Sequence, residues 1–159
     1  MTLIDLCKGK AEGSDSAKQW HGHVTALTVQ PNYRRLGLAR KLMNILEQVS
    51  EKKNTWFVDL FVRENNTGLF LPLKSYFCDN YDLQNFDLKF AKPRKAAHKL
   101  YTNLGYTVYR TILNYYGGGT GAVGEENAYD MRKSMSKDVK KETTIPLTRP
   151  VTADEIEWH

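Results

Sequence analysis

One stretch, from His23 to Val49, constrains the fold of this chain more than any other. β-Branched residues alternate through its first part and predict a strand near residues 22–29. Apolar residues then recur at helical spacing and predict an amphipathic helix near residues 37–52. The turn between them carries several arginines and Gly37, which lets a backbone approach a ligand closely. Free amides at a helix start, with the positive end of the helix dipole, suit an anion such as a pyrophosphate.

Other segments indicate a sheet around this stretch. Further strands are predicted near residues 2–8, 56–62, 106–116 and 127–132, and a second helix near residues 95–103. The run at 56–62 is apolar except for Asp59, which indicates a strand buried on both faces. Together these elements predict a mixed α/β sheet that carries helices. Residues 134–159 are charged and contain proline, so we expect a tail that lies extended on the surface or on a partner.

The turn also carries a recognisable motif. Arg34-x-x-Gly37-x-Ala39 fits the R/Q-x-x-G-x-G/A acetyl-CoA signature of the GCN5-related N-acetyltransferase (GNAT) superfamily. Five surrounding sequence segments make the resemblance more specific: GKAEG at residues 9–13, WHGHVTAL at 20–27, FVDLFVR at 57–63, LGYTVYRT at 104–111 and AYDMRK at 128–133. Together they resemble the catalytic subunits of the NatB N-terminal acetyltransferase. The resemblance implies a GNAT domain over residues 1–133, with a mixed, mostly antiparallel sheet flanked by helices.

The resemblance implies acetyl-CoA as cosubstrate and no metal. The pantetheine arm of acetyl-CoA is expected to pair with backbone groups of Leu27, Thr28 and Val29, where one backbone N–H stabilises the oxyanion. The pyrophosphate is expected to lie on the turn, which comprises Arg34, Arg35, Leu36, Gly37, Leu38 and Ala39. Asn66 matches a family asparagine that lies close to the cofactor and the active site.

Residues for the chemistry itself are implied in the same way. Tyr101 stands where many relatives carry a tyrosine that protonates the leaving thiolate; its alternative role is packing under the following strand. His23 is a candidate base, because its reference pKa of about 6.5 lies near neutrality, but it could instead line the peptide site or be structural. Thr25, Tyr115 and Tyr116 are the other expected peptide contacts, although the tyrosines could be an ordinary strand pair.

The resemblance sets the expected function as acetylation of the α-amine of proteins that begin Met-Asp, Met-Glu, Met-Asn or Met-Gln. The expected partners are the NatB auxiliary subunit and nascent polypeptide N-termini at the ribosome, in the cytoplasm. Two departures define an alternative, an impaired variant that binds only acetyl-CoA or the auxiliary subunit. In the family, two strands and two helices come before the first hairpin, whereas this chain begins inside the first strand of that hairpin. Residues 67–94 interrupt the family spacing and are interpreted as an insertion, a retained intron or splice variant rather than an evolved loop.

Composition argues against several other classes of protein. The net charge of +5 comes from lysines and arginines interleaved with acidic residues, so we expect no nucleic-acid-binding face. No apolar run has the length of a membrane span, and the N-terminus lacks the layout of a signal peptide. Two cysteines, Cys7 and Cys78, are too few for a disulfide scaffold and indicate a reducing compartment.

Two other motifs are discounted. Gly119-x-Gly121-x-x-Gly124 matches the dinucleotide fingerprint, but no helix is predicted after it. His21 and His23 would share one face of a strand, but the sequence indicates no third metal ligand.

Overall fold

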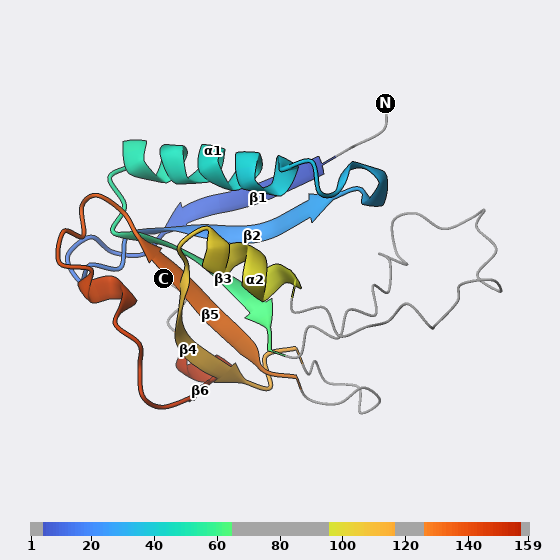
Figure 1. The fold of residues 1–159 in the computed structure, drawn as a ribbon. Coiled ribbons are helices and arrows are strands. Elements are labelled where there is room, and N and C mark those ends of the chain that lie inside the picture. Colours follow the sequence, from blue (N-terminus) through green and yellow to red (C-terminus); the bar gives the residue numbers. More distant parts are fainter. Residues whose placement is uncertain (1–4, 65–95, 117–125, 157–159) are drawn as a thin grey trace.

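A computed structural model describes residues 5–64, 96–116 and 126–156 of this chain (Figure 1). The elements are β1 (Asp5–Glu12), β2 (His21–Val29), α1 (Leu38–Lys52), β3 (Phe57–Arg63), α2 (Ala96–Asn103), β4 (Thr107–Leu113), β5 (Ala128–Ser134) and β6 (Val151–Thr152). Short 3₁₀ turns occur at Pro31–Tyr33, Glu142–Thr144 and Ala153–Glu155. The proposed insertion at 67–94, Asn66, Cys78 and the glycines at 119, 121 and 124 lie outside the described residues.

The strands form one six-stranded sheet in the order β1-β2-β3-β5-β4-β6. β2 pairs with β3 in parallel and β4 with β6 in parallel, whereas the other three neighbouring pairs are antiparallel. The predicted mixed, mostly antiparallel sheet with flanking helices is therefore confirmed. Among the described residues, no helix combines the length and the apolar content that crossing a membrane requires.

The two faces of β3 have different environments, because successive side chains of a strand point to opposite faces. Val58, Leu60 and Val62 join one buried cluster with Met43 from α1 and Tyr101 from α2, so both helices pack against this face (Figure 1). The other residues of β3, among them Asp59, point away from the helices. The functional side chains described below divide between these two faces.

Two strand boundaries differ from the predictions for local reasons. β1 continues to Glu12 instead of ending near residue 8, because it stays paired with β2 up to the Glu12–His21 pair. β4 ends at Leu113 instead of residue 116, because Asn114 adopts a left-handed conformation with a φ of 53°. The Asn114 N–H then donates to the Asn127 side-chain oxygen over 3.1 Å.

The predicted extended tail is wrong for residues 134–156, which fold onto the sheet. β5 itself runs to Ser134, and β6 pairs with the edge strand β4 through Ile112 and Val151. Val151 and Ile156 are buried together with Ile112 in a second apolar cluster. Isolated apolar residues in a charged segment show no periodicity, but they cover an edge strand that would otherwise be open.

Candidate functional site

The turn before α1 is open to solvent. Arg34, Arg35, Leu36 and Gly37 are all exposed, and among the described residues nothing lies within 4 Å of the position a Gly37 Cβ would take. Gly37 is the N-cap of α1 with a φ of 77°, in the left-handed region. Because glycine has no side chain to cap the first turn, the amides that begin α1 remain available to a ligand. Leu38 and Ala39, the last two predicted turn residues, are half-buried at the start of α1.

A cavity opens where β2 and β3 separate. Among the described residues, their parallel pairing runs from His21–Phe57 to Val24–Leu60 and ends there. Beyond that point lies a cavity of about 240 Å³, lined by residues of β2 and β3 and by Ala97, Tyr101 and Tyr116. Leu27 of the predicted pantetheine strand lines this cavity, and Leu27, Thr28 and Val29 all pair with β1 along the other edge of β2.

Tyr101 belongs both to this cavity and to the core. Its side chain comes from α2, is 9% exposed, and meets the Tyr106 ring edge-on at a centroid distance of 5.9 Å. Burial raises the pKa of Tyr101 to about 12, so its phenol keeps its proton at neutral pH. The structure therefore brings Leu27 and the predicted proton donor to one cavity, while leaving the packing role of Tyr101 intact.

Three of the predicted peptide residues, His23, Tyr115 and Tyr116, are linked through Phe61, which lines both this cavity and a second one described below and which the sequence did not single out. The Phe61 ring lies 5.4 Å from the His23 ring and 5.0 Å from the Tyr115 ring, edge-on to both. Tyr115 contacts Tyr116 at 4.9 Å, and the Tyr116 hydroxyl donates to the Phe61 backbone oxygen over 3.3 Å. Thr25 is exposed and lines the cavity between β2 and β3 instead.

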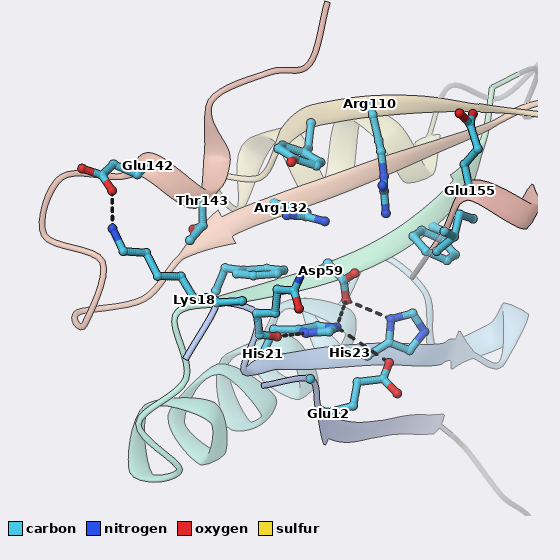
Figure 2. Close-up of a pocket in the computed structure, with 17 residues that line it drawn as sticks. Glu12, Lys18, His21, His23, Asp59, Arg110, Arg132, Glu142, Thr143 and Glu155 are labelled. Carbon is cyan, nitrogen blue, oxygen red and sulfur yellow. Dashed lines mark hydrogen bonds and ion pairs between the residues drawn. The ribbon is translucent and has the colours of Figure 1, made fainter. Parts of the chain in front are cut away.

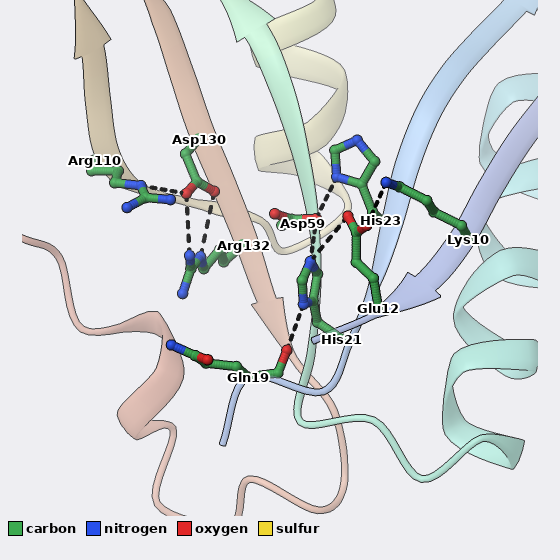
Figure 3. A network of polar contacts seen from close by, with 9 residues as sticks. All are labelled: Lys10, Glu12, Gln19, His21, His23, Asp59, Arg110, Asp130 and Arg132. Atoms are coloured by element: carbon green, nitrogen blue, oxygen red, sulfur yellow. Dashed lines mark hydrogen bonds and ion pairs between the residues drawn. The ribbon is translucent and has the colours of Figure 1, made fainter. Parts of the chain in front are cut away.

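His23 has a buried acidic partner. Its Nδ1 lies 2.8 Å from Oδ1 of Asp59, and both residues are buried (Figure 3). Burial alone would lower the pKa of His23, but the hydrogen bond to Asp59 and its charge raise that pKa above the usual value. Burial opposes ionisation of Asp59 too, yet the two histidines and Arg132 hold its pKa below the usual value. The hydrogen bond and the opposite charges thus favour the protonated form of His23 and the ionised form of Asp59.

Asp59 could have been found from the sequence. A carboxylate inside an otherwise apolar, buried strand needs a partner, because an unpaired buried charge costs several kcal/mol. The sequence could not say which residue pairs with it, since His21 and His23 both lie far from it along the chain. The parallel register of β2 and β3, with His23 opposite Asp59, decides this.

A larger cavity of about 440 Å³ lies on the face of the sheet opposite the helices (Figure 2). His21, His23 and Asp59 line it from β2 and β3, and Arg110 and Arg132 line it from β4 and β5. Both arginines bond to the buried Asp130 (Figure 3). The Arg132 guanidinium also lies 4.3 Å from the centroid of Phe57 and 3.6 Å from that of Tyr109. Residues 142, 143, 155 and 156 of the folded tail also line this cavity, as do residues of the connection between β1 and β2.

This face also holds groups that can ligate a metal. Glu12, His21 and His23 each place one potential ligand atom within 4.8 Å of the others. Glu12 is the third candidate ligand that the sequence analysis did not identify.

Comparison with known proteins supports a common origin for this architecture. The model of the Acetyltransferase (GNAT) family matches residues 7–69. The chain is 44% identical over 157 residues to the N-terminal acetyltransferase B complex catalytic subunit NAA20 of Arabidopsis thaliana, covering 98% of this chain and 70% of that protein. It is 43% identical over 144 residues to N-alpha-acetyltransferase 20 of Dictyostelium discoideum, covering 90% of this chain but only 62% of that relative.

A solved structure also places the chain among these acetyltransferases. The crystal structure of Chaetomium thermophilum Naa20, in complex with a bisubstrate analogue, superposes with a TM-score of 0.71 at 33% identity. The superposition covers 98% of this chain and 73% of that one.

Proposed function

The chain belongs to the GNAT acetyltransferases, in the family of NatB catalytic subunits, and we propose that it transfers acetyl from acetyl-CoA to the α-amine of protein N-termini. The observation that carries the proposal is the cavity between β2 and β3, where Leu27 and Tyr101 meet. The exposed Gly37 turn supports it, because a pyrophosphate needs open amides at a helix start. A cosubstrate that spans both features would place its thioester near Tyr101.

The proposed reaction is a direct transfer. The neutral amine attacks the thioester carbonyl, so that a C–N bond forms and the C–S bond breaks. A backbone N–H of β2 stabilises the oxyanion, and Tyr101 gives its proton to the leaving thiolate. The proton that the amine nitrogen loses passes through water and restores the Tyr101 phenol. Tyr101 carries the proton that this role requires, because its phenol is protonated throughout the physiological range.

We assign His23 to the peptide rather than to the amine proton. Nδ1 of His23 is already hydrogen-bonded to Asp59, which also raises the pKa of the ring, and a ring N–H of His23 can donate to a carboxylate or amide oxygen. This fits the proposed substrates, which carry Asp, Glu, Asn or Gln after the initiator methionine. Phe61, Tyr115 and Tyr116 offer an apolar wall for the methionine side chain.

The proposed partners follow from the family. The Arabidopsis relative is named as the catalytic subunit of a complex. We therefore propose that this chain works with an auxiliary subunit, on nascent N-termini at the ribosome and in the cytoplasm.

The test measures coenzyme A release from acetyl-CoA by the chain and its auxiliary subunit, with a Met-Asp peptide and a matched Met-Lys peptide. We expect turnover with the first peptide, little with the second, and a large loss in Tyr101→Phe. Tyr106→Phe is the matched control, since this buried hydroxyl donates to Glu47 and lies outside both cavities. Coenzyme A binding without turnover would favour the binding-only alternative, and full turnover by Tyr101→Phe would refute the proposed acid.

A further inference from the structure

Three side chains, Glu12, His21 and His23, form a cluster at the paired ends of β1 and β2, here called the His21 cluster. The β1–β2 register sets Glu12 opposite His21, and the alternation along β2 puts His23 on the same face as His21. The cluster lines the 440 Å³ cavity, so it can be reached from solvent (Figure 2). The side chains of Glu12 and His21 are 18% and 16% exposed, which leaves them accessible but largely desolvated.

The tautomer of His21 is fixed by its neighbour. Nδ1 of His21 lies 2.6 Å from the backbone oxygen of Gln19 (Figure 3). A carbonyl oxygen only accepts hydrogen bonds, so Nδ1 carries a proton. The lone pair of the neutral ring is therefore on Nε2. Metal-ligating histidines are held in this way, with one ring nitrogen donating to a carbonyl or carboxylate.

Nε2 of His21 faces two carboxylates. It lies 3.7 Å from Oε1 of Glu12 and 3.6 Å from Oδ1 of Asp59, which is too far for a hydrogen bond. Two carboxylates beside Nε2 attract a cation to this position, either a proton on the ring nitrogen or a metal ion. The separations suit a shared metal ion, since tetrahedral zinc with bonds of about 2.0–2.1 Å sets its ligand atoms about 3.3 Å apart.

The surrounding groups complete a zinc environment. Two histidines and one glutamate form a donor set that zinc uses in sites with one open coordination position. The other carboxylate oxygen of Glu12 pairs with Lys10, which orients Oε1 toward His21. Asp59 contacts both imidazoles and brings a buried negative charge to the site.

We propose that the His21 cluster binds one Zn²⁺ ion, through Nε2 of His21, Oε1 of Glu12 and a ring nitrogen of His23, which releases its second proton to solvent when the metal binds. The open coordination position faces the cavity. A consequence rests on the proposed function: an ion bound to His23 prevents that ring from contacting the peptide, so zinc inhibits acetyl transfer in competition with peptide and not with acetyl-CoA.

The binding test uses the full chain, stripped with a chelator and with both cysteines alkylated. Zn²⁺ is titrated against a chromophoric chelator, and Co²⁺ reports the coordination by its visible spectrum. We expect one ion per chain, an affinity at least about tenfold weaker in His21→Gln and in Glu12→Gln, and no change in His98→Gln. His98 is the matched control because it lies on α2 against Tyr129, outside the cluster. Circular dichroism checks that each variant is folded. If one of the two ligand variants fails to fold, the other still tests the proposal.

Each outcome decides the proposal. Stoichiometric binding that both ligand variants weaken and His98→Gln retains supports it. Absence of binding in the wild type, or binding that His21→Gln and Glu12→Gln leave intact, overturns it. Inhibition is measured separately, as the effect of added Zn²⁺ on coenzyme A release at varied peptide and acetyl-CoA concentrations. An inactive chain that still binds zinc contradicts the proposed function and not the metal site.

Discussion

The buried pair of His23 and Asp59 should couple strongly, and Asp59→Asn measures that coupling. The substitution keeps the shape and a hydrogen-bonding oxygen but removes the charge. A hydrogen bond between charged groups is worth about 1.5–3 kcal/mol when buried, so we expect a loss of about 2 kcal/mol in the free energy of unfolding. At this chain length that loss corresponds to a fall of about 6 °C in melting temperature.

The loss should depend on pH in a defined direction. Because the pKa of His23 is raised by folding, its contribution is complete below about pH 6.5 and disappears as the pH rises through the folded-state pKa. Because the pKa of Asp59 is lowered, its contribution is complete above about pH 4 and disappears at lower pH. The coupling is therefore largest between about pH 4 and 6.5, and smaller at pH 9.

The assay is a double-mutant cycle of Asp59→Asn and His23→Gln, by urea unfolding at pH 5.5 and pH 9. The cycle cancels effects that each residue has through its other neighbours, such as His21 and Arg132 around Asp59. A coupling energy below about 0.5 kcal/mol at pH 5.5, or one that is larger at pH 9, would refute the reasoning.

Three further predictions concern the turn, the cavity and the tail. Gly37→Ala should cost about 1 kcal/mol, because alanine is strained at a φ of 77°; an unchanged urea midpoint would contradict this. Tyr101→Phe should lower kcat by about 10²–10⁴-fold with little change in KM for peptide, and wild-type kcat should show no loss from Tyr101 ionisation up to about pH 10; an unaltered kcat would exclude Tyr101 as the acid. Ile156→Ala should lower stability by about 2 kcal/mol or more in a thermal melt, whereas a tail without packing would show no change.

Local patterns predicted most of the elements. The helix at 37–52 and the strand at 22–29 were predicted within one residue, because amphipathic spacing and β-branched residues are local signals. The left-handed Asn114 and the fold of residues 134–156 were not predicted. Both depend on contacts with distant segments, Asn127 in one case and β4 in the other.

The site residues fall into the same two groups: those with a local sequence signal and those that depend on contacts between distant segments. The Gly37 turn is contiguous in sequence, so its motif could be found directly. Phe61, Asp59 and Glu12 come from strands that meet only through the sheet register, and the first two look like core positions in the sequence. A buried acid in β3 was the available signal, but only the parallel pairing of β2 and β3 identifies His23 as its partner.

The central claim is that a diphosphate-bearing cosubstrate binds at the Gly37 turn, and calorimetric titration with coenzyme A tests it most directly. Arg35→Glu reverses one exposed charge at the turn, and Arg149→Glu makes the same change on the tail, where the arginine pairs with Glu155. We predict saturable binding by the wild type and by Arg149→Glu, and binding about tenfold weaker, or 1.4 kcal/mol, for Arg35→Glu. A folded wild-type chain that gives no heat, or equal affinity in both variants, would contradict the account.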